Sequence, residues 1–125
     1  MLIDTDVLIW CLRGNPKALA RLDGLADCRV SQVTRMELIA GCRDKAEMRL
    51  LKRFLADGGF RVMPLSEEIG HRADLWLEEH VLQHGAGLAD CLIAATASLA
   101  GLPLLTGNHK HFRHFPALEV EEFRP

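Results

Sequence analysis

Short apolar runs alternate along the chain with longer segments in which apolar residues recur every three or four positions. The short runs have the length of buried strands, and the longer segments have the period of amphipathic helices. The predicted strands are residues 2–4, 28–30, 60–65, 104–106 and 118–120, and the predicted helices are residues 7–12, 15–25, 34–41, 46–56, 66–84, 89–100 and 108–112. This alternation predicts an α/β fold, with a short parallel sheet of four or five strands flanked by helices on both faces.

Capping residues, glycine and proline mark several of these boundaries. Asn15 and Pro16 begin a helix, because Asn is a preferred N-cap and Pro fits the first helical position. Ser66 is expected to cap the long helix that follows it, and Gly101 with Pro103 behind it ends another helix. No repeat, low-complexity stretch or linker interrupts the series, so we expect a single domain over residues 1–125.

Composition narrows the class of protein. A hydrophobic fraction of 49% excludes a disordered chain. No apolar run approaches the roughly 18 residues that a membrane span needs, and no secretory-signal pattern is visible, so we expect a cytoplasmic protein without a membrane partner. Because no C-x-x-C pair occurs, four cysteines are interpreted as buried thiols: Cys11, Cys28, Cys42 and Cys91.

Charge is unevenly distributed along the chain. The formal net charge is −2, but residues 1–62 carry 11 Lys and Arg against 8 Asp and Glu, whereas residues 63–125 carry 4 against 9. A mildly acidic total argues against a protein that coats nucleic acid generally. It allows a basic face beside an acidic pocket.

Three acidic residues and one amide fall where strands end or helices begin. Asp4 ends the first strand, Glu37 follows the second, Asp90 opens its helix and Asn108 follows the fourth strand. In a parallel sheet these positions share the carboxyl edge, where ligands bind. Carboxylates without soft ligands suit Mg²⁺ or Mn²⁺ better than zinc. We therefore expect a divalent-metal site at this edge, with Asp6 acting as a cap for the next helix rather than as a ligand.

Each candidate also has a purely structural interpretation. Thr34 and Glu37 spell a capping box, in which the Glu side chain bonds only the backbone at the helix start. Asp90 can simply complement the helix dipole, and Asn108 can simply be an N-cap. Asp4 is harder to explain in this way, because a carboxylate at the end of an apolar strand needs a partner. The residues alone leave these alternatives open.

Four stretches, taken together and in order, resemble the PIN domain family, and most closely its VapC-like toxins. The stretches are LIDTDVLIW (2–10), VTRMEL (33–38), GLADCLIAATA (87–97) and LLTGNHKHF (104–112). The resemblance spans the whole chain. It implies one PIN domain over residues 1–125 and an Mg²⁺- or Mn²⁺-dependent endoribonuclease that is the toxin of a type II toxin–antitoxin pair.

The resemblance also assigns roles to residues. It implies that Asp4, Glu37 and Asp90 are catalytic metal ligands and that Asn108 stands at a fourth, often acidic, catalytic position. The neutral amide of Asn108 departs from the acidic pattern and is expected to bind a metal more weakly. The residues expected to line the site are Thr5, Asp6 and Thr106. Because His111 matches a common family residue, the stretch HKHFRH (109–114) need not be a zinc cluster.

RNA also requires positive partners on the protein. The residues predicted to contact RNA are Arg35, Lys45, Arg49, Lys52, Arg53 and Lys110. Four of them form one stripe of the helix 46–56, which is equally typical of a solvated helix face. The resemblance further implies a VapB-like antitoxin and a homodimer.

Two competing functions stay open at the level of sequence. One is a catalytically weak PIN-like module that binds RNA or protein, and the other is a different metal-dependent phosphoryl hydrolase. The absence of a Walker-type run and of G-x-G-x-x-G disfavours the second.

Overall fold

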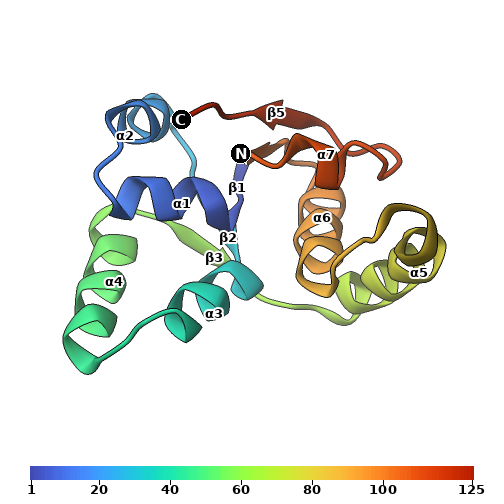
Figure 1. Cartoon of the computed structure of the whole chain (residues 1–125), viewed down its shortest axis with the longest axis horizontal. Helices are drawn as coiled ribbons and strands as arrows, with labels where there is room; N and C mark the ends of the chain where they lie inside the picture. Colours follow the sequence, from blue (N-terminus) through green and yellow to red (C-terminus); the bar gives the residue numbers. More distant parts are fainter.

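The computed structural model describes all residues 1–125 and contains one parallel five-stranded sheet (Figure 1). The strands are β1 (Leu2–Ile3), β2 (Arg29–Ser31), β3 (Arg61–Met63), β4 (Leu104–Thr106) and β5 (Val120–Glu122). Their spatial order is β3-β2-β1-β4-β5, and all neighbouring strands are parallel. The chain therefore winds outward in one direction from β1 to β3 and returns to the other side of β1 as β4. In such sheets, ligands bind at the carboxyl ends of the two strands where the order reverses.

Helices cover both faces of the sheet, as the alternating pattern predicts. They are α1 (Thr5–Leu12), α2 (Pro16–Asp23), α3 (Gln32–Ala40), α4 (Lys45–Asp57), α5 (Glu67–His84), α6 (Leu88–Ala100) and α7 (His109–Phe112). One buried cluster holds apolar side chains of α5, α6 and α7, and a second holds those of α1, α2 and α4. α3 contributes Val33 to the first cluster and Leu38 to the second.

The central strands divide their side chains between these two clusters. In β1, Leu2 belongs to the α5–α6 cluster and Ile3 to the α1–α4 cluster, and in β4 the same holds for Leu104 and Leu105. All four side chains are fully buried, with 0% exposure. Successive residues of a strand point to opposite faces, so two residues are enough for β1 to join both halves of the core.

Two helices begin earlier than the sequence predicts. α1 begins at Thr5 with Asp4 as its N-cap, and α3 begins after Ser31, whose hydroxyl accepts a hydrogen bond from the Val33 amide at 3.1 Å. A capping side chain that directly follows the strand lets the helix start at once. Thr34 is consequently a buried residue inside α3 and not its cap.

Some apolar residues that fit the helical period are exposed and do not belong to the core. Leu19 on α2 and Val81 on α5 have 42% and 40% of their surface exposed, although both fit the apolar spacing of their helices. The small side chain of Ala18 is the buried contact of α2. Spacing alone could not reveal this, because both sides of these helices carry apolar residues. Boundaries of β2, β3 and β5 also shift by one to two residues from those predicted.

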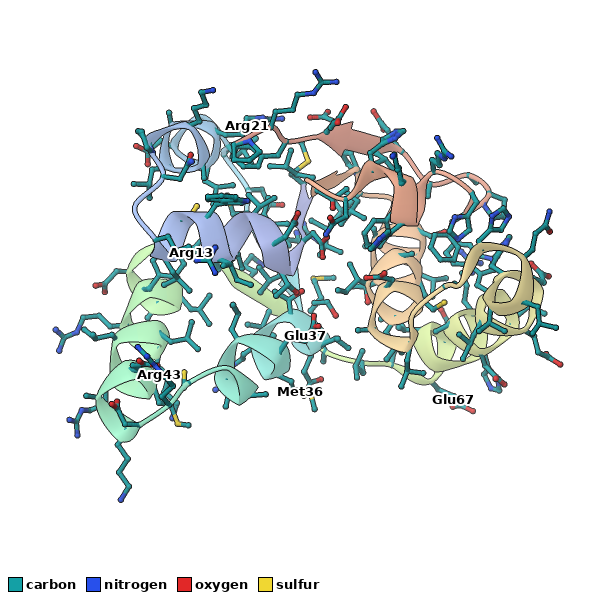
Figure 2. All side chains as sticks on the ribbon, viewed as in Figure 1. Arg13, Arg21, Met36, Glu37, Arg43 and Glu67 are labelled. Carbon is teal, nitrogen blue, oxygen red and sulfur yellow. The ribbon has the colours of Figure 1, made fainter.

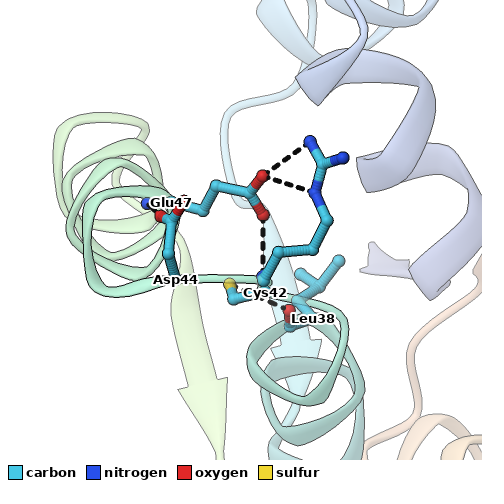
Figure 3. A network of polar contacts seen from close by, with 5 residues as sticks. Leu38, Cys42, Asp44 and Glu47 are labelled. Carbon is cyan, nitrogen blue, oxygen red and sulfur yellow. Dashed lines mark hydrogen bonds and ion pairs between the residues drawn. The ribbon is translucent and has the colours of Figure 1, made fainter.

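The connection between α3 and α4 is fixed by a local polar network (Figure 3). The Asp44 carboxylate caps α4 by accepting from the Glu47 amide at 2.8 Å. The Glu47 carboxylate accepts from the Arg43 amide at 2.9 Å and from its guanidinium at 2.8 Å, and these bonds lower the pKa of Glu47. This corner sets the separation of the two helices, whose facing sides form an apolar groove described below.

The cysteines are all free thiols, as their spacing predicts. Cys11 and Cys91 are buried, and Cys28 and Cys42 are half-buried. Burial raises the pKa of the Cys11 thiol to about 11, so it stays protonated and unreactive at neutral pH. None of the helices is both long enough and apolar enough to cross a membrane.

We predict that Leu105→Ala lowers the free energy of unfolding by about 2–5 kcal/mol, because it opens a cavity in a fully buried central strand. Leu88→Ala is the matched control, since Leu88 is 67% exposed and its truncation should change stability by less than about 0.5 kcal/mol. Urea unfolding of both variants measures the difference. Equal losses in the two variants would contradict the position of Leu105 in the core.

Candidate functional site

Asp4 lies at the carboxyl end of β1, where the strand order reverses, and only 4% of its surface is exposed. One carboxylate oxygen accepts from the Thr5 amide at 2.8 Å, and the other accepts from the Thr106 hydroxyl at 2.7 Å. Burial is the largest cause and, together with the nearby negative charge of Asp6, raises the pKa of Asp4 to about 7 against the lowering effect of these hydrogen bonds. Asp4 is therefore a desolvated carboxyl group held between the start of α1 and the end of β4.

Asp6 belongs to the same site and does not cap a helix, which corrects the prediction from sequence. It lies in the first turn of α1, and one of its oxygens accepts from the Gly107 amide at 2.9 Å. Its other oxygen, Oδ1, is buried and has no hydrogen-bond partner. Burial raises the pKa of Asp6 as well. An orphaned buried oxygen of this kind is free to accept a hydrogen bond from a ligand or to coordinate a cation.

Gly107 permits this contact because it has no side chain. A Cβ at position 107 would lie 2.5 Å from Oδ2 of Asp6, closer than atoms that are not bonded can approach. Gly107 is not among the residues that the sequence predicts for the site. Its signal in the sequence is a glycine directly after the fourth strand, where a backbone approaches another group closely.

Asp90 is brought to the same edge by the first turn of α6. Its Oδ2 lies 3.3 Å from Nδ1 of His111, which comes from α7. Burial raises the pKa of Asp90, His111 opposes that rise, and the negative charges of Glu37 and Asp6 reinforce it. Asp90 thus has specific partners in other elements, which its role in complementing a helix dipole does not explain.

Glu37 points from the middle of α3 toward the start of α1, and Figure 2 shows it in this central position. Its carboxylate accepts from the Thr5 hydroxyl at 2.7 Å, and that hydroxyl also lies 3.0 Å from the hydroxyl of Thr34. The capping-box alternative is wrong, because α3 begins at Gln32 and Glu37 lies in its later part. The exposed carboxylate therefore stands at the entrance of the site rather than at a helix start.

Thr106 and Asn108 complete the edge at the end of β4. Thr106 is fully buried, and its hydroxyl donates to Asp4 while accepting from the Asn108 amide N–H at 2.9 Å. Asn108 occupies the N-cap position of α7, but its side chain makes no capping hydrogen bond. The side chain of Asn108 is exposed, so its amide group is free to meet a ligand.

The four carboxylates influence one another electrostatically. Asp6 and Asp90 raise the pKa of Asp4, while Glu37 and Asp6 raise that of Asp90. Like charges held together in this way favour either a bound proton or a bound cation. The donors are all oxygens, the set that Mg²⁺ and Mn²⁺ prefer, and the free Oδ1 of Asp6 adds an unused one. In their present rotamers, however, no three His, Cys, Asp or Glu side chains surround a single point closely enough to hold one ion.

The residues predicted to contact RNA fall into separate places. Four lie exposed on α4: Lys45, Arg49, Lys52 and Arg53. Lys52 borders a groove of about 380 Å³ together with Arg35 of α3, and this groove opens beside β3, at the edge of the sheet. Lys110 lies on α7, directly before His111, which contacts the Asp90 carboxylate. The α4 cations and Lys110 therefore lie on separate elements of the fold.

Several known proteins are similar to this chain in sequence and in fold. The family model of the PIN domain matches residues 1–118. Ribonuclease VapC10 of Mycobacterium tuberculosis is 41% identical over 126 residues, covering 95% of this chain and 90% of the relative. Ribonuclease VapC19 of the same organism is 33% identical over 123 residues, covering 94% and 96%. A solved toxin–antitoxin complex from Klebsiella pneumoniae contains a chain with a TM-score of 0.80 and 27% identity, with 98% of both chains covered.

The protein is a parallel α/β domain with carboxylates gathered at its topological switch point. This architecture is that of a class of proteins that includes metal-dependent phosphodiesterases. Within that class, this chain belongs to the PIN domain family. The resemblance of its four motifs to that family and the predicted α/β architecture are both confirmed.

We predict that metal-free protein loses stability as the pH rises from about 4 to about 7. The folded-state pKa of Asp4, about 7, exceeds its ordinary value of 3.8, so the folded protein binds this proton more tightly than the unfolded chain. The stabilisation is complete below about pH 4 and disappears as the pH passes the folded-state pKa. In Asp4→Asn this titration is absent, and at pH 7.5 we expect a Tm roughly 4 °C above that of the wild type, which corresponds to about 1 kcal/mol.

Thermal unfolding in excess chelator across this pH range measures the effect. Asp74→Asn, at an exposed aspartate of α5, is the matched control and should follow the wild type. Parallel pH profiles for the wild type and Asp4→Asn would show that Asp4 is not strained in the folded state.

Proposed function

We propose that this protein is an endoribonuclease, the toxin of a type II toxin–antitoxin pair, that hydrolyses phosphodiester bonds in RNA in the cytoplasm. The observation that carries the proposal is the convergence of Asp4, Asp6, Asp90 and Glu37 at the switch point of the sheet, with three of their pKa values raised. The names of the similar ribonucleases support it. They also disfavour the two alternatives considered from sequence, a binding module and another class of phosphoryl hydrolase.

A divalent cation, Mg²⁺ or Mn²⁺, fits the donor chemistry of this cluster. Asp4, Asp90 and Glu37 would hold it, with the free Oδ1 of Asp6 as a further oxygen. In the present rotamers these carboxylates do not converge on one point. When bound, such an ion lowers the pKa of a coordinated water and neutralises charge on the scissile phosphate.

The chain's own residues keep these carboxylates in place. Thr106 and the Thr5 amide fix both oxygens of Asp4, so its orientation does not depend on a ligand. The Thr5 hydroxyl holds Glu37, and His111 holds Asp90. Each acid therefore has a partner from a different element, and the geometry of the site follows from the packing of α1, α3, α6 and α7 around the end of β1.

We predict that Asp90→Asn reduces metal-dependent RNA cleavage at least about 100-fold, a loss of about 2.7 kcal/mol in transition-state stabilisation. The reason is that an amide binds a hard cation far more weakly than a carboxylate. The assay follows end-labelled total RNA in Mn²⁺, with excess chelator as a second arm. Asp74→Asn, a matched change at an exposed position, should keep full activity. Full activity of purified Asp90→Asn, or cleavage that persists in chelator, would falsify the proposal.

The stripe of cations on α4, assisted by Arg35, is proposed to attract RNA. None of these residues forms an ion pair, so their charges are available to phosphates. Arg49→Glu combined with Arg53→Glu is expected to raise KM severalfold and to flatten its dependence on salt. The control is Lys17→Glu with Arg61→Glu, exposed on α2 and β3. Identical KM values and salt dependence in the two double variants would remove α4 from the RNA-binding surface.

A VapB-like antitoxin is the proposed protein partner. An apolar groove of about 470 Å³ runs between α1, α3 and α4, is lined by residues such as Leu12, Leu38 and Leu50, and reaches Glu37. An antitoxin segment in this groove would block access to the acidic cluster, and the toxin–antitoxin complex of similar fold supports this arrangement. A homodimer is also proposed, because Leu75 and Leu82 expose apolar surface on α5.

A further inference from the structure

A wholly polar pocket, distinct from the two grooves described above, lies beside the acidic cluster at the corner between β4 and α7. It has a volume of about 290 Å³ and is lined by Gly107, Asn108, His109, Lys110, His111, Arg113 and Glu122, so no hydrophobic side chain borders it. We call it the α7 pocket. Pockets for drug-like ligands are mostly apolar, and a wholly polar lining is typical of sites that bind charged, hydrated groups.

The α7 pocket carries positive charge on two side chains that no carboxylate of the protein neutralises. Lys110 and Arg113 are exposed and take part in no ion pair. The one carboxylate in the lining, Glu122, is already engaged with the Arg124 guanidinium at 3.3 Å. Within a chain of net charge −2, this corner is thus a local concentration of uncompensated cations.

Two residues connect this pocket directly to the acidic cluster. His111 borders the pocket while its Nδ1 lies 3.3 Å from the Asp90 carboxylate. Gly107 borders it while its amide donates to Asp6. A single imidazole ring therefore separates an anion in the pocket from the carboxylates. That arrangement places a positive subsite directly next to a negative one.

Asn108 gives the pocket a neutral donor at its inner side. The side chain caps no helix and is exposed, and an amide NH₂ donates hydrogen bonds that a carboxylate in the same place does not. An aspartate at position 108 would add negative charge facing Lys110 and Arg113 and repel an approaching phosphate. The amide therefore suits a phosphate ligand better than a metal ligand.

We propose that the α7 pocket binds the RNA phosphate adjacent to the scissile one, with Lys110, Arg113 and Asn108 as its contacts. This inference rests on the proposed ribonuclease function and assigns to the site its neighbouring phosphate subsite. Asn108 is then a substrate contact. A positive subsite of this kind fixes the register of the strand, so that the next phosphate comes to lie over the carboxylates.

Binding of RNA in excess chelator tests the proposal independently of cleavage. The probe is a fluorescein-labelled, single-stranded RNA of about twelve nucleotides and mixed sequence, followed by anisotropy over a range of salt concentrations. Lys110→Gln with Arg113→Gln should weaken binding about tenfold. It should also reduce the slope of log Kd against log salt by about 0.7, the value for one phosphate contact on a single strand. Lys17→Gln with Arg61→Gln, which removes the same charge elsewhere, should change neither quantity.

Asn108→Asp separates the two roles of that residue. As a phosphate contact it should weaken RNA binding about tenfold, whereas a metal ligand at this position should leave RNA binding in chelator unchanged and strengthen Mn²⁺ binding. Lys110→Arg keeps the charge and should retain the affinity of the wild type. All these positions are exposed, so the variants are expected to fold, and circular dichroism is the measurement that checks it.

Cleavage gives a further test once the cut site is mapped. A neutral methylphosphonate beside the scissile bond should lower kcat/KM of the wild type about tenfold and have little further effect on Lys110→Gln with Arg113→Gln. If the protein cleaves no RNA, the ribonuclease proposal fails, while the binding measurements still decide on the pocket. Unchanged RNA affinity and salt slope in the double variant would overturn the subsite. The same conclusion follows if that variant loses only its affinity for a protein partner.

Discussion

The structure depends on one buried carboxylate at the end of its central strand. Asp4 is almost fully enclosed, and it is held by the Thr106 hydroxyl and the Thr5 amide. The same side chain caps α1, ends β1 and joins β1 to β4. Removing a carboxyl group from water is costly, and these two hydrogen bonds offset only part of that cost, as the raised pKa shows. The part of the desolvation cost that remains lowers the stability of the fold, and it favours the binding of a cation or a proton by this carboxyl group.

The architecture could be predicted from sequence because its signals are strong and local. Alternating apolar runs and helical periods gave the order of strands and helices, and Asn15 and Ser66 cap their helices as predicted. The convergence of Asp4, Glu37 and Asp90 also followed from topology, since ends of parallel strands share an edge. Helix starts were less predictable. Ser31 and Asp4 cap their helices directly at the strand ends, so the caps predicted at Thr34 and Asp6 are wrong.

The contacts between individual side chains of the site could not be predicted from the sequence. The contact of Asp6 with the Gly107 amide joins residues about a hundred positions apart, and no periodicity encodes it. The proximity of His111 to Asp90 depends on how α7 folds back over the start of α6. Glu122 is the carboxylate of the α7 pocket, and only the structure shows that it pairs with Arg124 and leaves Lys110 and Arg113 without an ion-pair partner. Packing, rather than residue type, therefore separates the cations beside the carboxylates from those on α4.

The place of β1 in the sheet has a consequence for the protein during its synthesis. The central strand β1 pairs with β4 only when residues 104–106 have been made, and the Thr106 hydroxyl that orients Asp4 arrives with them. A nascent chain still emerging from the ribosome thus lacks half of the support for its first acidic residue. Pairings so distant in sequence form late and slowly. The acidic cluster is in this way completed only after residues 104–106 have been synthesised, later than any of its four carboxylates.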